Sequence, residues 1–468
     1  MRVATKALSQ LLALAGRNPS DEVTIDAGAR ALKTRFFAED AAAAALAAGG
    51  AIAADLWTMR SGTKQRVHVS TREVAAGLVS FMHQKFGDES LAPPMRGQLD
   101  AARTAANGFQ KTRDRRFIFL HPSFPESTKR LLRVLDCPDE PDAVKATVAR
   151  WDAMDLENAI AEVRGCAAVA RSPEEWDASE QGRIIGARPV VEVIKIGDSN
   201  PAPFKRGERP LSGMRVLDLT RVLAGPTCAR TLAQYGADVM AISSPNLPSV
   251  PFFVTDTGHG KLSAFVDLKT KEGRETLLGL VRQSDVFSQG YRQGALEQLG
   301  FGPVTLAALR PGIVVTEINC YGHEGPWRGR AGWEQLAQTA SGMAIVHGGE
   351  ETPKLQPGAV TDYTTGYLAA FGTLVALARR ANYGGSYLVR VSLTQTAMWI
   401  RSLGFADNSF DDVEPVSPAE VRSFSVESET GFGLMTYLRP AVQMSQTPVY
   451  WARPVVPLGT HPPEWPKN

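Results

Sequence analysis

An aspartate that directly precedes a long apolar segment is the first candidate for chemistry in this sequence. Asp362 lies in the stretch GAVTDYTTGYLAAFGTLVAL, and the residues after it, 363–380, predict a helix. Backbone N–H groups at a helix N-terminus can stabilise a carboxylate and nearby oxyanions, so Asp362 could act as a reactive group. Asp is also a favoured N-cap residue, and capping alone would contribute roughly 0.5–2 kcal/mol. Position alone leaves both interpretations open.

The spacing of cysteines and histidines argues against a metal site. The four cysteines lie far apart with no C-x-x-C pair, and the seven histidines never cluster at ligand spacing. We therefore predict a thiol-containing, cytoplasmic protein with no metal and no disulfide framework. The stretch GHGKLS at 258–263 gives only G-x-G-x-x-S, and it precedes a strand instead of opening a helix. A nicotinamide cofactor is therefore not expected.

The composition is that of a globular protein. Of the 468 residues, 44% are hydrophobic and 21% charged, which excludes a disordered or fibrous chain. Lys and Arg number 51 against 49 for Asp and Glu, so nothing suggests a nucleic-acid partner or a membrane surface. No apolar run approaches the ~20 residues of a membrane span. At roughly 100–200 residues per domain, the length allows two to four domains.

From about Leu211 the chain alternates strand signals with helical stretches. The first strand signal is 214–220 (MRVLDLT), and helices are predicted over 228–235 and 270–282. This rhythm predicts an α/β fold with a Rossmann-like, doubly wound parallel sheet and helices on both faces. Ligands of such sheets bind at the carboxyl ends of the strands, so RVLAGP, directly after the first strand, is a natural site loop.

An internal repeat links the two halves of the chain. Residues 40–70 align without a gap to 362–392, with ten of 31 positions identical in the order Asp, Gly, Gly, Val-x-Val-Ser. Both copies predict a helix that follows an aspartate, then a Gly turn, a strand and a helix. The chain therefore joins the rear of one unit to the front of a second, related unit.

At this point the residues resemble the family III CoA-transferases, the CaiB/BaiF group. LDLTRVLAGPTCARTLAQYGADV is similar to the family's opening strand, CoA-binding loop and first helix. GHGKLSAFVDLKTKEGRETLLGLVRQSDVFSQGYRQGALEQLGFG is similar to its next two β-α units, and YGHEGPWRGRAGWEQLAQTASGM to a later segment. GFQKTRDRRFIFLHPSF and SPEEW resemble the family's smaller domain, and the tail from SQTPVYW resembles its C-terminal return segment. The match covers most of the chain, in a rearranged order.

The resemblance divides the chain into four parts. We expect N-terminal helices and a partial repeat unit over 1–75 and a small α+β domain over 76–205. A Rossmann-like CoA-binding domain is expected over 206–400, and the C-terminal return segment over 401–468. The family forms interlocked dimers, so a homodimer is implied, in which the small domain closes either its own site or that of a partner.

The resemblance also implies the chemistry. Family members transfer coenzyme A between an acyl-CoA and a carboxylic acid through mixed anhydrides and an aspartyl-CoA thioester, and the matching catalytic residue is Asp362. Its repeat counterpart, Asp40, has no CoA loop before it and is interpreted as a relic helix cap. Glu334 matches a position where many members carry Asp. It could support the site by hydrogen bonding, or act as a first-turn acid on the dipole of helix 333–343.

Fewer of the family's CoA-contacting residues have a match in this sequence. The matching loop residues are Val222, Leu223 and Ala224, and Leu223 replaces a glutamine of the formyl-CoA branch, which argues against that branch's small polar substrates. Tyr291 stands where the family has an aromatic residue. The remaining cations for the CoA phosphates are Lys261 and Arg292, for which ordinary solvated surface charge is an equal alternative. The sequence therefore predicts few cations in position to bind the CoA phosphates.

Two other functions stay open. The sparse cations and the truncated repeat would also suit a degenerate, non-catalytic CoA-binding or structural partner subunit. An acyl-CoA racemase or isomerase is disfavoured, because Trp333 stands where that branch has its histidine base and tryptophan cannot exchange a proton. His323 is interpreted as a loop histidine and not as a substitute base.

Overall fold

The largest sheet is a seven-stranded, mostly parallel one. The structure is a computed structural model that describes residues 2–87, 104–122, 124–406 and 410–466. Six strands run parallel and the last, at one edge, is antiparallel. The chain order of the parallel strands, 3-2-1-4-5-6, is typical of doubly wound sheets, which confirms the predicted α/β class. In spatial order the strands are β10 (Lys261–Phe265), β9 (Asp238–Ser243), β8 (Arg215–Leu219), β11 (Val286–Gln289), β12 (Val314–Asn319), β13 (Ser386–Ser392) and β7 (Glu192–Gly197).

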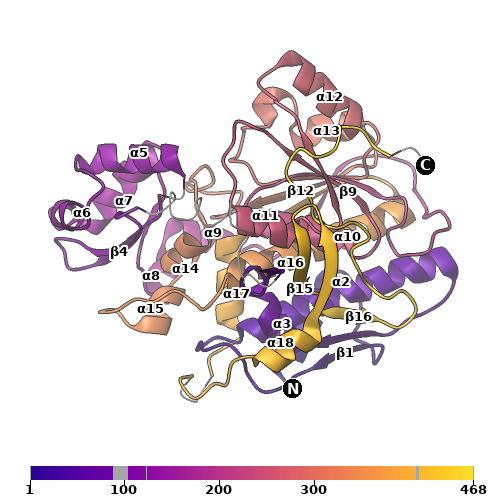
Figure 1. Cartoon of the computed structure of the whole chain (residues 1–468), viewed down its shortest axis with the longest axis horizontal. Coiled ribbons are helices and arrows are strands. Elements are labelled where there is room, and N and C mark those ends of the chain that lie inside the picture. The colour runs from indigo at the N-terminus through magenta and orange to yellow at the C-terminus, as the bar shows by residue number, and fades with distance from the viewer. Residues whose placement is uncertain (1, 88–103, 123, 407–409, 467–468) are drawn as a thin grey trace.

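Helices cover both faces of this sheet, because its strands are apolar on both sides. Figure 1 shows α12 and α13 above the strands and α10, α16 and α2 below them. One hydrophobic core lies under α12 (Lys271–Val281) and α13 (Pro303–Leu309), and a larger one lies around α10 (Ala224–Ala233) and α16 (Val360–Tyr383). The predicted helix over 228–235 begins earlier, at Ala224, because the site loop turns directly into it.

The internal repeat is visible as two equivalent helix–strand–helix units. The first is α2 (Ala38–Ser61), β2 (Val67–Ser70) and α3 (Thr71–Gly77); the second is α16, β13 and α17 (Leu393–Ser402). A Cβ added at Gly50 would lie 2.7 Å from Val67, and one at the equivalent Gly372 would lie 2.6 Å from Val389. Each glycine therefore admits the same close approach of helix to strand, which explains why the pair recurs in both copies.

Helix α2 packs along α16 and forms a third layer. Among the described residues, it is the one helix long and apolar enough to cross a membrane, and 78% of its most apolar window is buried inside the protein. The same layer holds α1 (Val3–Leu14) and a three-stranded sheet of β1 (Val23–Asp26), β2 and β16 (Val442–Met444).

A small domain projects from this body, at the left in Figure 1. Its antiparallel sheet and three helices enclose a separate core. Helix α8 (Pro173–Ala178) leads back to the body. The Ser-Pro pair followed by acids predicts a helix start here, and the structure has a Ser172–Glu175 capping box at this point. The domain consists of β4 (Gly108–Lys111), β5 (Phe117–Leu120), α5 (Pro125–Leu135), α6 (Pro141–Val148), α7 (Ala153–Glu162) and β6 (Ala167–Val169).

Further elements join the small domain to the body. Helix α9 (Glu180–Gly186) follows α8, and the predicted single helix over 333–343 is two helices, because Gly342 has a φ of 92° and ends the first. These two are α14 (Glu334–Ala340) and α15 (Met343–Gly348). The sequence also predicts a loop over 93–107, most of which lies outside the described residues.

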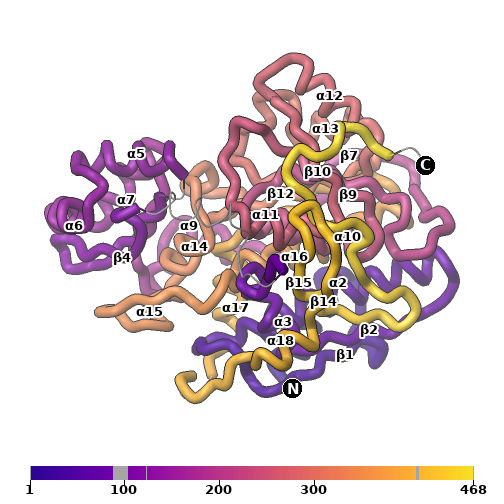
Figure 2. The backbone as a smooth tube through the Cα atoms, in the orientation of Figure 1, coloured from indigo at the N-terminus to yellow at the C-terminus, as the bar shows by residue number. Residues whose placement is uncertain are grey.

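The C-terminal segment crosses back over the large sheet, as the yellow tube in Figure 2 shows. The N–H of Gly260 donates to the carbonyl of Arg453 (2.8 Å), and the N–H of His461 donates to that of Ser263 (2.8 Å), so the tail lies along β10. The remaining elements are η1 (Ser80–Met82), β3 (Lys85–Phe86), α11 (Pro251–Thr257), η2 (Glu297–Leu299), α18 (Pro418–Phe424), β14 (Ser425–Thr430) and β15 (Gly433–Leu438).

Candidate active site

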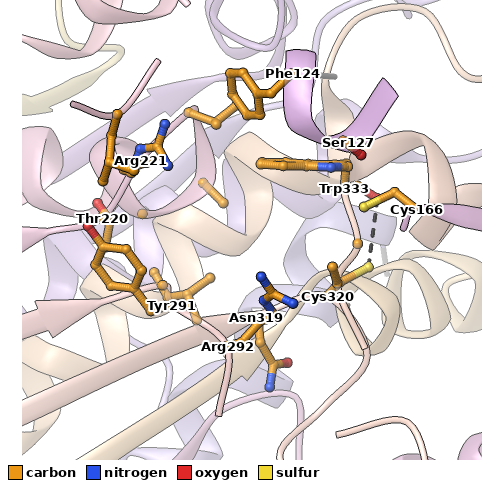
Figure 3. Close-up of a pocket in the computed structure, with 18 of the residues that line it drawn as sticks. Phe124, Ser127, Cys166, Thr220, Arg221, Tyr291, Arg292, Asn319, Cys320 and Trp333 are labelled. Atoms are coloured by element: carbon orange, nitrogen blue, oxygen red, sulfur yellow. Dashed lines mark hydrogen bonds between the residues drawn. The ribbon is translucent and has the colours of Figure 1, made fainter. Parts of the chain in front are cut away.

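A cavity of about 730 Å³ lies between the carboxyl ends of the large sheet's strands and the small domain. Its floor comes from the loop after β8, from residues after β11 and from the end of β12, so it opens where the connections leave the sheet in opposite directions. This switch point is where ligands of doubly wound sheets bind. Its other wall comes from α5 and from the segment between α7 and β6 of the same chain. Figure 3 shows the side chains that line it.

Asp362 lines the cavity from the first turn of α16. The helix begins at Val360 and its N-cap position is Ala359, so the alternative interpretation, that Asp362 only caps the helix, is wrong. The residue is 9% exposed, and within the described residues no group donates a hydrogen bond to its carboxylate. Burial first, and then the negative charge of Glu334, raise the pKa of Asp362 well above its usual range. The carboxylate is therefore uncommitted, and it is a stronger base than an exposed aspartate.

Glu334 binds the backbone N–H groups at the start of α16 that were expected to stabilise Asp362. Its carboxylate accepts the N–H of Thr361 (3.0 Å), the N–H of Asp362 and the hydroxyl of Thr361. Gln338 donates to it as well. Burial raises the pKa of Glu334 and these hydrogen bonds lower it, so the contacts favour the ionised form of Glu334 over that of Asp362. The expectation that the helix N–H groups stabilise Asp362 directly is corrected, because Glu334 takes them.

The site loop after β8 is held in an unusual backbone conformation. Val222 has a φ of 69°, which is rare for a β-branched residue. A Cβ at Gly225 would lie 2.2 Å from Thr220, and one at Gly366 of α16 would lie 2.5 Å from the carbonyl of Ala224. Gly225 lets the loop turn tightly against Thr220, and Gly366 lets it approach the helix that carries Asp362. Val222, Leu223 and Ala224 all line the cavity, as predicted of a site loop.

Lys261 does not reach this cavity. Its ammonium group is buried, 2.8 Å from a carboxylate oxygen of Asp218 and 2.8 Å from the carbonyl of Pro226. It therefore ties β10 to the end of β8 and to the start of α10. The expectation of a cation free to bind the CoA phosphates is wrong for Lys261, because Asp218 neutralises it.

The expected scarcity of cations is also corrected. Tyr291 and Arg292 line the cavity after β11, and Figure 3 shows Arg292 between Tyr291 and Cys320. More arginines line the same cavity, two of them from the small domain, and sequence reasoning missed these because nothing in the local pattern joins them to the sheet. The six are Arg130, Arg164, Arg221, Arg292, Arg328 and Arg330.

An aromatic contact joins the two walls. The Trp333 ring lies 5.7 Å from that of Phe124, centroid to centroid, in an edge-to-face arrangement. Cys166 and Cys320 lie beside Trp333, and burial raises the pKa of Cys166 to about 11. Phe124 and Cys166 also belong to the small domain, and sequence reasoning did not single them out.

The other two candidates lie away from the cavity. His323 is buried, with Nε2 3.1 Å from the carbonyl of Val391, and burial lowers its pKa to about 4, consistent with a structural histidine. Asp40 lies at the start of α2, where burial and then the charge of Glu39 raise its pKa to about 6. The cavity that Asp362 lines does not include Asp40.

Fold and site together define an α/β protein with a buried, unpaired carboxylate in a cavity at the switch point of a doubly wound sheet. The chain belongs to CoA-transferase family III, whose family model matches residues 13–201 and 211–432. Each matched stretch contains one copy of the internal repeat, residues 40–70 and residues 362–392.

Curated relatives of this chain include proteins named as CoA-transferases. Acetyl-coenzyme A transferase nodX of Hypoxylon pulicicidum is 33% identical over 67% of this chain and 57% of its own length. The succinyl-CoA–L-malate CoA-transferase beta subunit of Chloroflexus aurantiacus is 33% identical over 38% of this chain and 48% of its own length. The chain thus spans about half the length of these relatives. The crystal structure of a CAIB/BAIF family protein from Brucella suis is 25% identical over 49% of this chain and 65% of that one, with a TM-score of 0.37.

Proposed function

We propose that this protein transfers coenzyme A from an acyl-CoA to a carboxylic acid, with Asp362 as the nucleophile. The observation that carries the proposal is the Asp362 carboxylate itself. It faces the cavity, it accepts no hydrogen bond within the described residues, and its pKa is raised by burial and by Glu334. An uncommitted carboxylate with raised basicity suits attack on a thioester carbonyl.

The proposed reaction has four steps. The Asp362 carboxylate attacks the donor thioester, and CoA thiolate leaves to give a mixed anhydride. The thiolate then attacks the aspartyl carbonyl, which releases the donor acid and leaves an aspartyl-CoA thioester. The acceptor carboxylate attacks this thioester, which gives a second anhydride and CoA thiolate. Attack of the thiolate on the acceptor's acyl carbonyl releases the new acyl-CoA and restores Asp362.

The surrounding residues support these steps by position. The loop Val222–Ala224 and Tyr291 border the space on the sheet side and are proposed to contact CoA, with Arg292 as a charged contact at the mouth. Glu334 is a positioning residue. It holds the backbone of Thr361 and Asp362, and its charge keeps the pKa of Asp362 high.

Hydroxylamine trapping tests the proposal. Incubation with an acyl-CoA and hydroxylamine should convert Asp362 to a hydroxamate, which peptide mass spectrometry locates. Asp362→Asn should abolish the adduct and the transfer of CoA. Asp40→Asn is the matched control, because Asp40 has the equivalent place in the repeat and should leave both unchanged. A wild-type chain without an adduct, with full turnover in Asp362→Asn, would exclude Asp362 as the nucleophile.

We propose further that the chain closes its own site. Both walls of the cavity come from one chain, which supports intramolecular closure by the small domain. The homodimer that the family resemblance implies stays a prediction, as does the cytoplasmic location, and neither is needed to complete the cavity. Light scattering after size exclusion, combined with CoA-transfer assays on each species, tests this. Activity confined to the dimer would contradict intramolecular closure.

A further inference from the structure

Four of the six cavity arginines, Arg130, Arg164, Arg292 and Arg328, have no side-chain partner within the described residues. Arg130 on α5 and Arg164 after α7 belong to the small domain, and Arg292 follows β11 of the large sheet. Within the described residues, none of the four guanidinium groups forms an ion pair or a side-chain hydrogen bond. The other two cavity arginines are paired: Arg330 donates to Asn158 (2.7 Å) and lies 3.6 Å from Glu157, and Arg221 donates to the carbonyl of Pro248.

Two of these unpaired arginines, Arg130 and Arg164, act on a third, Arg292. Burial first, and then the positive charges of Arg164 and Arg130, lower the pKa of Arg292. Arg292 and Arg130 also act on the same thiol, that of Cys166, so the three groups face one space across the two domains. Like charges held this close repel each other, and a bound anion would relieve the repulsion.

No carboxylate of the cavity wall neutralises this group. Besides Asp362, the acid that lines the cavity among the described residues is Glu126. Its carboxylate pairs with the ammonium group of Lys129 at 2.8 Å and interacts more weakly with Arg130, with which it forms no ion pair. The pKa of Asp362 is raised by burial and by Glu334, and none of the three arginines is among the groups that shift it. The positive charge is therefore available to a ligand, and it lies apart from the carboxylate that would react.

We propose that Arg130, Arg164 and Arg292 form an oxyanion subsite shared by the two domains, which binds a negatively charged end of the substrate away from the reacting carbonyl. The inference rests on the proposed CoA transfer and specifies its substrates. Guanidinium groups bind carboxylate and phosphate with the same paired N–H geometry. The oxyanion is therefore either a phosphate of CoA or the second carboxylate of a dicarboxylic acid, and binding it draws the small domain toward the sheet.

Equilibrium binding to two matched pairs of ligands tests the subsite without requiring turnover. Calorimetry would compare the wild-type chain with the double variant Arg130→Gln/Arg164→Gln. The probes are coenzyme A against pantetheine, which lacks the phosphates, and succinate against butyrate, which lacks the second carboxylate. Arg133→Gln is the control, because Arg133 is an exposed arginine on the same helix outside the cavity.

The expected loss is about tenfold in affinity for one of the two probes, coenzyme A or succinate. Affinity for its counterpart, which lacks the group in question, and all affinities of the Arg133→Gln control should be unchanged. If the double variant loses affinity for coenzyme A, the ligand of the subsite is a phosphate. If it loses affinity for succinate, the ligand is the second carboxylate. Equal affinities in wild type and double variant, or no measurable binding of any probe to the wild-type chain, would overturn the subsite. The binding measurement does not depend on Asp362 as the nucleophile. Failure of that assignment would appear instead as the absence of a hydroxamate at Asp362 in the trapping experiment.

Discussion

The Glu334 carboxylate accepts the backbone N–H of Asp362, so the neighbour of the candidate nucleophile takes up the donors at the start of α16. This has two consequences for Asp362. Its backbone is anchored by a second helix, and in the part of the chain that the structure describes its side chain has neither a hydrogen bond nor a positive charge to stabilise its ionised form. The arrangement favours a basic, reactive carboxylate at the expense of folded-state stability.

Glu334→Gln should shift the pH dependence of catalysis. The nucleophile must be deprotonated, so kcat/KM should rise with pH as Asp362 loses its proton. Removal of the Glu334 charge lowers the pKa of Asp362 and should move this limb to lower pH. The amide can accept with only one oxygen, so we also expect about a tenfold drop in the limiting rate. The measurement is a pH–rate profile of both forms. An unmoved limb would show that Glu334 does not influence the titration of Asp362.

Asp362→Asn should stabilise the protein at neutral pH. A carboxyl whose pKa is raised on folding binds protons more tightly in the folded state, so its contribution to stability falls as the pH rises above its unfolded pKa, about 4. The variant should therefore gain about 1–2 kcal/mol at pH 7.5, and the gain should shrink toward pH 4. Urea unfolding at several pH values measures it. Asp40→Asn should give the same sign, with the change confined to the range between pH 4 and about 6. A variant less stable than wild type at pH 7.5 would contradict the expected sign.

Lys261→Met should destabilise the fold, because it leaves the buried carboxylate of Asp218 without its charge partner. Loss of one partner of a buried pair costs about 3–5 kcal/mol. The matched control is Lys269→Met, since Lys269 is exposed and should change stability by less than about 0.5 kcal/mol. Urea unfolding compares the two. Similar, small effects would mean that the Lys261–Asp218 pair contributes nothing to the fold.

Gly366→Ala should impair both stability and CoA transfer. The added methyl would lie 2.5 Å from the carbonyl of Ala224, so the site loop and α16 must move apart. We expect a loss of about 1–3 kcal/mol and a rise in KM for the acyl-CoA. Gly279→Ala on α12 is the control: its methyl meets nothing within 4 Å, and alanine's helix propensity should stabilise that helix by up to ~1 kcal/mol. Wild-type kinetics in Gly366→Ala would show that this close approach does not position the loop.

The sequence by itself determined the elements and their rhythm. Apolar strand signals such as 214–220, helical spacing over 270–282 and the capping pattern at Ser172 are local, so the structure reproduces them within a few residues. The helix after Asp362 was predicted from the same kind of signal, and the repeat of residues 40–70 in 362–392 was visible as identity. The site loop followed from its place directly after the first strand of the sheet.

Only the tertiary structure decided which charges are available. Lys261 looks like a free cation in the sequence, yet Asp218, 43 residues away, neutralises it. Glu334 and Asp362 come together across 28 residues, and their hydrogen bonds determine which carboxylate stays uncommitted. The unpaired arginines of the small domain face Arg292 across more than a hundred residues of chain. Sequence patterns report the preferences of neighbouring residues, whereas burial, pairing and repulsion depend on distances that only the folded chain establishes.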